Sequence, residues 1–185
     1  MHRLHSHTRL FALLASIALP FAAAQTRPVT AERIIAADSE PQNWLAHGRT
    51  YGEQRYSPLK QVNDGNVEKL GLAWSYATNS TRGLQATPIV VDGRMYATGV
   101  WSVVYALDAK TGKELWTYDP QVPREWGRYA CCDAVNRGVA LWGDALYFAT
   151  LDGRLISLDA RTGKQRWVIN TIDRTKPYTI TGAPR

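Results

Sequence analysis

Short runs in which hydrophobic and polar residues alternate fill the second half of the chain, and these runs recur at a fixed distance. Residues 90–119 and 140–170 align with a constant offset of 51 positions. The pairs matched at this offset are Tyr96 with Tyr147, Leu107 with Leu158, Asp108 with Asp159, Thr111-Gly112-Lys113 with Thr162-Gly163-Lys164, and Trp116 with Trp167. Alternation with a period of two predicts β-strands, and a repeat of about this length is typical of propellers and solenoids.

Each repeat divides into strands and a tight turn. RMYAT and ALYFAT predict one strand of each unit, and the following SVVYALD and RLISLD predict the next strand. The sequences DAKTGK and DARTGK then predict hairpin turns, because glycine takes up a positive φ without a steric clash. ELW and QRW open the last strand of each unit, which places a tryptophan where it can dock one unit on the next. The alternative is a generic β-meander with coincidental turns.

The region before the repeats predicts less regular structure. Residues 30–37 predict a short helix with Thr30 as its N-cap, and residues 66–71 predict one helical turn that ends at a Gly71 C-cap. Residues 72–76 are similar to the tryptophan strand of an earlier unit. A blade takes about 40–50 residues and a ring has about 4–8 blades. The chain therefore holds two full units and parts of others, and we expect a truncated piece of a longer propeller.

The first 24 residues predict a secretory signal peptide. A short basic start with Arg3 and Arg9 precedes the apolar run LFALLASIALPF, and three alanines end at Ala24. The alternative is a transmembrane helix, which needs about 20 apolar residues and so exceeds this run. We expect cleavage after Ala24, export to the periplasm, no transmembrane segment, and residues 25–185 as the amino-terminal part of the propeller.

Charge and histidine content argue against several classes of function. The formal net charge is +6, but Lys and Arg are interspersed with Asp and Glu, and no basic stripe indicates a nucleic-acid partner. Three of the four histidines lie within residues 1–24, which leaves only His47. A histidine-based metal cluster and a Ser-His-Asp triad are therefore not expected. The sequence also has no glycine-rich phosphate loop and no haem-attachment motif.

Two cysteines, Cys131 and Cys132, are adjacent in the sequence. Thiols of an exported protein tend to oxidise. A disulfide between neighbours is strained, because usual disulfides separate the Cα atoms by at least about 4.4 Å and a trans peptide sets about 3.8 Å. The alternative is a pair of free or intermolecularly bonded thiols, and the spacing alone leaves both open.

Several segments carry a resemblance to a known family. The most specific is the run CCDAVNRG from Cys131 to Gly138. The others are the segment from Trp44 to Leu59, ATPIV at 86–90, the two tryptophan turns, and YTITGAP at 178–184. Together they resemble the PQQ-dependent alcohol dehydrogenases over nearly all of residues 40–185. CCDAVNRG is similar to the vicinal-disulfide motif of that family, and the segment from Trp44 is nearest to the quinohaemoprotein branch.

The resemblance implies an all-β fold, an eight-bladed β-propeller of four-stranded blades that holds pyrroloquinoline quinone (PQQ) on its axis, of which this chain covers the first few blades. It implies that Cys131 and Cys132 form a disulfide platform against one face of the quinone. Arg137 matches the arginine that polarises the reactive quinone oxygen. Thr181 matches a hydroxyl that bonds a cofactor carboxylate, with an ordinary strand threonine as the alternative. Gln85 stands where the family usually has a glutamate in contact with the cofactor, so the chain departs from the pattern there.

The implied activity is oxidation of small primary alcohols to aldehydes by hydride transfer to the quinone. Ca²⁺ assists as a Lewis acid and a carboxylate acts as base. The resemblance puts the calcium ligands and that base beyond residue 185, so we expect no metal ligand within this chain and no activity from the chain alone. Electrons would pass to cytochrome c, to a quinone acceptor or to haem c in a carboxy-terminal part. The alternative is a non-enzymatic propeller scaffold of the outer-membrane assembly type, which explains the repeat but not Cys131 and Cys132 together with Arg137.

Overall fold

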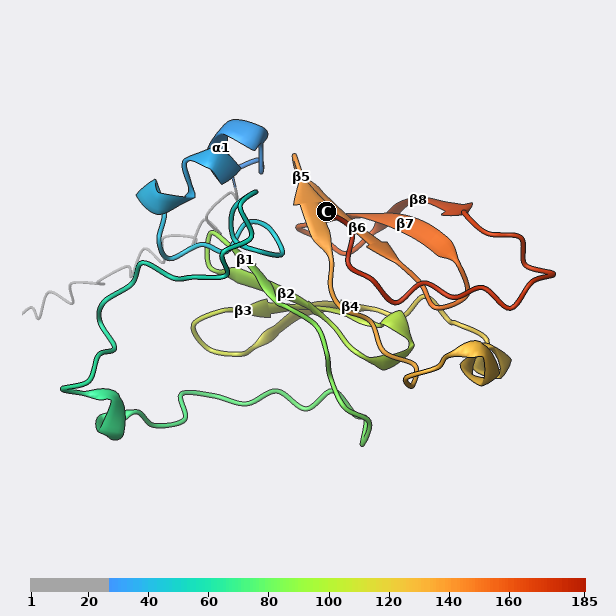
Figure 1. Ribbon diagram of the computed structural model, residues 1–185, viewed down its shortest axis with the longest axis horizontal. Coiled ribbons are helices and arrows are strands. Elements are labelled where there is room, and N and C mark those ends of the chain that lie inside the picture. The colour runs from blue at the N-terminus through green and yellow to red at the C-terminus, as the bar shows by residue number, and fades with distance from the viewer. Residues whose placement is uncertain (1–26) are drawn as a thin grey trace, which may run out of the picture.

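Two four-stranded antiparallel sheets form the body of the protein in the computed structural model, which describes residues 27–185 (Figure 1). The predicted signal peptide and its cleavage site lie outside this range. In each sheet the strands follow one another in chain order. The first sheet consists of β1 (Ile89–Val91), β2 (Arg94–Thr98), β3 (Val104–Asp108) and β4 (Glu114–Tyr118), and the second consists of β5 (Ala140–Trp142), β6 (Ala145–Ala149), β7 (Arg154–Asp159) and β8 (Gln165–Asn170).

The strands predicted from the repeat are confirmed, and so is the all-β class. The pairings β2–β3 and β6–β7 are each in register over five residues. The two outer pairings shift register at the corresponding place, between Ala106 and Leu107 in the first sheet and between Ser157 and Leu158 in the second. The 51-residue repeat of the sequence is therefore a structural repeat that extends to its β-bulges.

Hydrogen bonds inside the turn of each repeat explain why DAKTGK forms a tight hairpin. The Asp108 Oδ1 atom accepts from the Thr111 N–H and from its hydroxyl, both at 2.8 Å. Gly112 has a φ of 71° and donates its N–H to the Asp108 carbonyl at 2.8 Å. The same contacts recur in the second sheet at Asp159, Thr162 and Gly163. A positive φ at this place explains the glycine in both repeats.

A tryptophan docks the first sheet on the second, as predicted. Trp116 on β4 donates its indole N–H to the Ala160 carbonyl at 3.2 Å. Its ring covers Gly163, where an added Cβ atom would lie 2.6 Å from Trp116 Cδ2. The Tyr118 hydroxyl donates to the Gln165 side chain at 2.5 Å beside it. Glycine is thus required at position 163 by the indole as well as by the turn.

Trp74 docks on the first sheet in the same way. Its indole N–H donates to the Ala109 carbonyl at 3.2 Å, and an added Cβ atom at Gly112 would lie 2.4 Å from Trp74 Cε3. Residues 72–76 nevertheless form no strand, because a strand needs a hydrogen-bonded neighbour and none pairs with this segment within the described residues. The likeness to a tryptophan strand therefore holds for the side chain and not for the backbone.

One hydrophobic core runs through both sheets. Tyr96 in β2 and Phe148 in β6 are its largest fully buried side chains. The Tyr96 hydroxyl donates to the Ala160 carbonyl at 3.1 Å, and burial raises the pKa of Tyr96 to about 12. The core continues into the amino-terminal segment through Val29 and Leu45, both almost completely buried.

The amino-terminal segment crosses from one sheet to the other. The helix α1 (Ala31–Ile35) lies above the sheets in Figure 1, and Thr30 caps it as predicted. Val29 forms an isolated bridge with Gly143 of the second sheet, and Trp44 forms one with Val90 of the first sheet. The segment therefore joins the two sheets independently of the docking tryptophans.

The other helices are short. They are the 3-10 helices η1 (Ala37–Ser39), η2 (Val67–Lys69), η3 (Val100–Ser102) and η4 (Arg124–Tyr129). The predicted helical turn is η2, but it ends at Leu70, which has extended backbone angles, so the prediction of a Gly71 C-cap is wrong. Within residues 27–185, no helix has the length and apolar character needed to cross a membrane.

Candidate functional site

The loop from Cys131 to Gly138 connects η4 to β5, and its second half is anchored in the core. Cys131 and Cys132 are exposed, whereas Ala134, Val135 and Asn136 are buried. The Asn136 side chain donates to the Ala149 carbonyl at 2.7 Å, and its Oδ1 accepts from the Gly138 N–H at 3.0 Å. The buried half of the loop thus fixes the place from which the two cysteines project.

Arg137 and Thr181 are in direct contact. The Arg137 Nη1 atom donates to the Thr181 hydroxyl at 2.6 Å, and the Arg137 backbone N–H donates to the Thr181 carbonyl at 3.0 Å. The Arg137 carbonyl accepts from the Thr87 N–H at 3.2 Å. Three segments far apart in sequence therefore meet at Arg137, which is half-buried.

Close packing around Gly138 explains the glycine at this position of the motif. Its φ is 135°, and an added Cβ atom would lie 3.1 Å from the Thr87 carbonyl oxygen. Both features disfavour any other residue. Gly138 thus lets residues 85–87 approach the segment that carries Arg137.

Gln85 lies on that approaching segment, two residues before Thr87, and it is exposed. No hydrogen bond joins its side chain to Arg137 or Thr181 in the described part of the chain. Of the five residues predicted for the site, the structure brings Arg137 and Thr181 together and places the two cysteines and Gln85 on the adjoining segments.

Cys131 and Cys132 are free thiols whose sulfur atoms are 2.8 Å apart. A disulfide needs about 2.05 Å, so the predicted bond is not formed in this structure and stays a prediction. The contact with Cys131 raises the pKa of the Cys132 thiol, while the positive charge of Arg137 acts in the opposite direction. The arginine is thus close enough to influence the cysteine pair electrostatically.

Sequence reasoning missed a second arginine at this loop. Arg82 forms an ion pair with Asp133, the residue directly after the cysteines. Trp101, whose φ is 60°, lies beside them and donates its backbone N–H to the Ala134 carbonyl at 2.8 Å. The guanidinium groups of Arg82 and Arg124 lie 5.9 and 4.4 Å from the Trp101 ring centroid. A positive φ at a bulky residue has no signature in the sequence, so no local pattern indicated this cluster.

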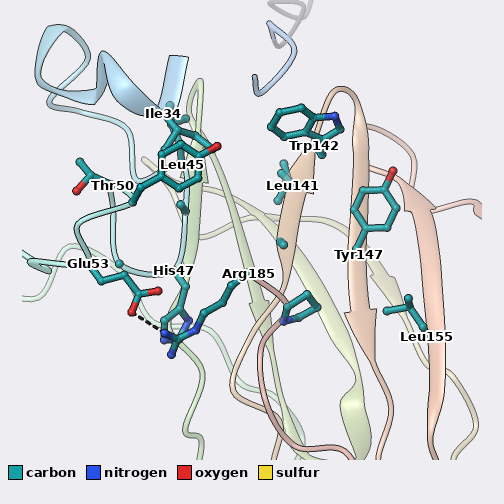
Figure 2. Close-up of a pocket in the computed structure, with 15 residues that line it drawn as sticks. Ile34, Leu45, His47, Thr50, Glu53, Leu141, Trp142, Tyr147, Leu155 and Arg185 are labelled. Atoms are coloured by element: carbon teal, nitrogen blue, oxygen red, sulfur yellow. Dashed lines mark hydrogen bonds and ion pairs between the residues drawn. The ribbon is translucent and has the colours of Figure 1, made fainter. Parts of the chain in front are cut away.

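A separate, mostly apolar cavity of about 480 Å³ lies between the amino-terminal segment and the second sheet (Figure 2). Figure 2 shows His47 and the Glu53–Arg185 ion pair at one end, with Trp142 and Tyr147 along the wall. Burial lowers the pKa of His47, whose Nδ1 atom has no hydrogen-bond partner among the described residues. None of the five predicted site residues lines this cavity, so its size does not make it the candidate site.

The chain has the features of a tryptophan-docked β-propeller. Its meander sheets are joined by docking tryptophans, and an arginine lies beside the loop with the adjacent cysteines. The sequence model of one such family, described as "Glucose/ethanol/alcohol dehydrogenase, beta-propeller domain" of the PQQ type, matches residues 44–167. The chain belongs to this family, as the resemblance of its motifs implied.

Known members of the family are similar to the chain over most of its length. It is 58% identical over 177 residues to the quinohemoprotein alcohol dehydrogenase ADH-IIG of Pseudomonas putida, covering 94% of this chain and 25% of that protein. It is 60% identical over 143 residues to a 1-butanol dehydrogenase (cytochrome c) of Thauera butanivorans, covering 77% of this chain and 21% of that protein. The chain spans about a quarter of the length of the curated relatives it matches.

Solved structures agree with these relationships. The structure of the Pseudomonas putida enzyme superposes with a TM-score of 0.85 at 59% identity, covering 88% of this chain and 24% of that one. The quinohemoprotein alcohol dehydrogenase of Comamonas testosteroni superposes with a TM-score of 0.81 at 53% identity, covering 85% and 24%.

Proposed function

We propose that the chain forms part of a periplasmic PQQ-dependent alcohol dehydrogenase that oxidises small primary alcohols to aldehydes. The observation that carries the proposal is the contact of Arg137 with Thr181 beside the Cys131–Cys132 loop. Family membership and the names of the relatives support it. The scaffold alternative accounts for the sheets but gives no reason for a guanidinium held beside two exposed cysteines.

The residues present suit an anionic quinone. Arg137 offers several donors in a rigid fork, of which Thr181 engages one. Thr181 and Gln85 add a hydroxyl and an amide that can donate to carboxylates. When bound, PQQ supplies the two-electron acceptor for the alcohol. In this proposal Arg137 holds positive charge at the quinone oxygen, Thr181 orients Arg137, and Gln85 replaces a carboxylate by a neutral group.

A disulfide between Cys131 and Cys132 completes the proposed platform. The two sulfur atoms are already in contact at 2.8 Å, and export to an oxidising compartment favours the bond. Residues 1–24 would direct that export and be removed after Ala24. Thiol titration of unfolded, unreduced protein should find no free thiol, and two free thiols would reject the platform.

Calcium and an electron acceptor belong to the same proposal. The family resemblance puts the Ca²⁺ ligands and the base beyond residue 185. Within residues 27–185, no three His, Cys, Asp or Glu side chains cluster as a metal site. The relatives' names include quinohemoprotein and cytochrome c, which supports haem c or cytochrome c as the route for electrons.

Further blades would complete the propeller of which residues 25–185 form the amino-terminal part. Trp167 on β8 corresponds to Trp116, and it is 39% exposed. On a third sheet, the glycine of a turn of the Asp-Ala-Lys-Thr-Gly-Lys type would lie under the Trp167 ring, as Gly163 lies under the Trp116 ring. The exposed Trp167 supports a further blade after β8, and the number of eight blades rests on the family resemblance.

A chimera tests the proposed function. Residues 27–185 replace the matching quarter of the Pseudomonas putida relative, and dye-linked oxidation of ethanol and 1-butanol is measured with and without PQQ and Ca²⁺. We expect turnover that requires both, and tighter PQQ binding in the Gln85→Glu chimera. The unaltered relative is the control. A folded chimera that binds no PQQ, beside a relative that binds it, would reject the proposal.

A further inference from the structure

An ion pair joins the segment before β1 to the cysteine loop. The Arg82 guanidinium contacts the Asp133 carboxylate across 51 positions of sequence. The two side chains are 51% and 36% exposed. The pair lies at the surface, so it adds little free energy to folding. What it can do is fix the conformation of the loop that carries the two cysteines.

Asp133 holds an unusual backbone conformation directly after the cysteines. Its φ is 73°, in the left-handed region that most side chains avoid. Its Oδ1 atom accepts from the Ala134 N–H at 2.7 Å and also contacts Arg82. Arg82 thus contacts the same oxygen that stabilises the left-handed turn, and this turn begins at the residue directly after Cys132.

Trp101 supports Arg82 and the loop at the same time. Its ring lies under the Arg82 guanidinium at 5.9 Å, and its backbone N–H holds the Ala134 carbonyl at 2.8 Å. Arg124 stacks on the same ring at 4.4 Å but forms no ion pair within residues 27–185. The two arginines therefore share one aromatic contact and differ in the bond to Asp133.

We propose that Arg82 is a positioning residue for the adjacent cysteines: through Asp133 it holds their sulfur atoms close enough to form and keep the disulfide. The proposal deepens the proposed function, because it rests on that disulfide as the quinone platform. In the reaction the two thiols lose two electrons and two protons, and glutathione disulfide is reduced to two glutathione molecules as the S–S bond forms. Releasing Asp133 widens the range of sulfur positions and lowers the effective concentration of one thiol at the other.

The equilibrium constant of this thiol–disulfide exchange measures how well the loop holds the two sulfur atoms together. The 185-residue chain is equilibrated with mixtures of reduced and oxidised glutathione, quenched and analysed by mass for the intramolecular bond. Arg82→Ala should lower the constant by about two- to fivefold, the range of exposed pairs, and Arg82→Lys should recover part of it. Arg124→Ala, the matched control, should leave it unchanged. Salt at about 1 M, where charges are screened within about 3 Å, should lower the parent's constant and not that of Arg82→Ala.

Two further variants separate positioning from folding. Asp133→Asn tolerates the left-handed turn and should lower the constant as Arg82→Ala does, and the double variant should fall no further than either alone. The reduced forms of all variants should have the same melting temperature as the reduced parent. An unchanged constant in Arg82→Ala, or an equal loss in Arg124→Ala, would overturn the proposal, and so would a parent that forms no intramolecular bond. If the exchange behaves as expected but the chimera binds no PQQ, the positioning role stands and the proposed function fails.

Discussion

At the scale of single residues, Arg137 is fixed by hydrogen bonds of its backbone N–H, of its carbonyl and of one guanidinium nitrogen. Among residues 27–185, Thr181 alone accepts from the Arg137 guanidinium, and it engages only Nη1. Most of the guanidinium donors therefore have no partner in this part of the chain and can face a ligand. A fixed cation of this kind contributes most where negative charge grows during reaction. The contact with Thr181 therefore gives the arginine a direction without consuming its capacity to donate.

Arg137→Lys in the chimera should reduce alcohol turnover by about 10²–10³-fold, because lysine keeps the charge and loses the fork. Stability should change little, since the side chain is only half-buried. Steady-state turnover and melting temperature of the two chimeras provide the measurement. Thr181→Val is the companion variant, and it should lower turnover less because the guanidinium remains. Turnover equal to that of the parent would remove Arg137 from the reaction.

The residues of the site were predictable only in part. Arg137 and Thr181 are 44 positions apart, and nothing in periodicity joins them; the resemblance of their motifs did. Arg82 and Asp133 were not predicted as a pair, because their contact depends on a left-handed φ at Asp133 and on the path of a segment without regular structure. Local sequence patterns predict neither this backbone conformation nor the path of that segment.

At the scale of elements, the turn glycines combine a backbone requirement with a packing requirement. Gly163 and Gly93 both have a positive φ, 71° and 80° respectively, but their surroundings differ. Gly163 lies beneath the Trp116 ring, whereas nothing lies within 4 Å of a Cβ atom added at Gly93. A comparison of the two positions therefore separates the backbone strain of a positive φ from steric crowding by the indole ring.

Gly163→Ala should lower the free energy of unfolding by about 2–4 kcal/mol, since it adds overpacking against Trp116 to the strain of a positive φ. Gly93→Ala, the matched variant, should cost about 1 kcal/mol because it adds strain alone. Urea denaturation followed by tryptophan fluorescence measures both. Equal losses would mean that the docking of Trp116 adds nothing to the requirement for glycine.

Arg33 of α1 forms ion pairs with two carboxylates, that of Asp92 in the β1–β2 turn and that of Glu40, which follows η1. Glu40 accepts from Arg33 at 2.8 Å, and that bond lowers the pKa of Glu40 to about 2 from 4.5. Because the folded pKa is the lower one, the stabilisation is complete above about pH 4.5 and is lost as the pH falls toward 2.

Glu40→Gln should therefore cost about 1–3 kcal/mol at pH 7 and show a shallower loss of stability between pH 5 and 3 than the parent. Melting temperatures across that range measure the effect. Arg27→Gln is the control, because Arg27 contacts the same carboxylate but is 63% exposed, and it should cost less than about 1 kcal/mol. Parallel pH profiles of Glu40→Gln and the parent would contradict the assignment.

Elements were predicted best where a strand has its partners nearby. The strands of both repeats follow the sequence pattern because each pairs with the next one along the chain. Residues 72–76 carry the same tryptophan pattern, and yet they form no strand because they lack a paired neighbour. Propensity therefore gave the location of strands, while pairing decided whether a strand formed.

At the scale of the whole molecule, the two sheets end in unequal surfaces. Every residue of β8 is exposed, including Val168 at 40% and Ile169 at 51%, whereas Trp116 and Tyr118 on β4 are partly covered by the second sheet. An exposed apolar strand with a free edge is a site of association.

The 185-residue chain should therefore self-associate through β8, and Ile169→Lys should weaken that association by about tenfold or more, the loss expected for one buried aliphatic side chain. Sedimentation velocity over a range of concentrations measures it. Ile35→Lys is the control, because Ile35 is 72% exposed on α1, away from a sheet edge. A monomer at all concentrations, or an equal effect of both substitutions, would contradict this prediction.

The docking of each tryptophan on a later turn also imposes an order in time. Trp116 finds its hydrogen-bond acceptor 44 residues further along the chain, and Trp74 finds its acceptor 35 residues further along. At a synthesis rate of about 5–20 residues per second, roughly 2–9 s pass between the appearance of Trp116 and that of Ala160. The docking tryptophan of each sheet thus stays exposed until the next sheet has been synthesised. A chaperone that recognises exposed tryptophan would have that interval in which to bind.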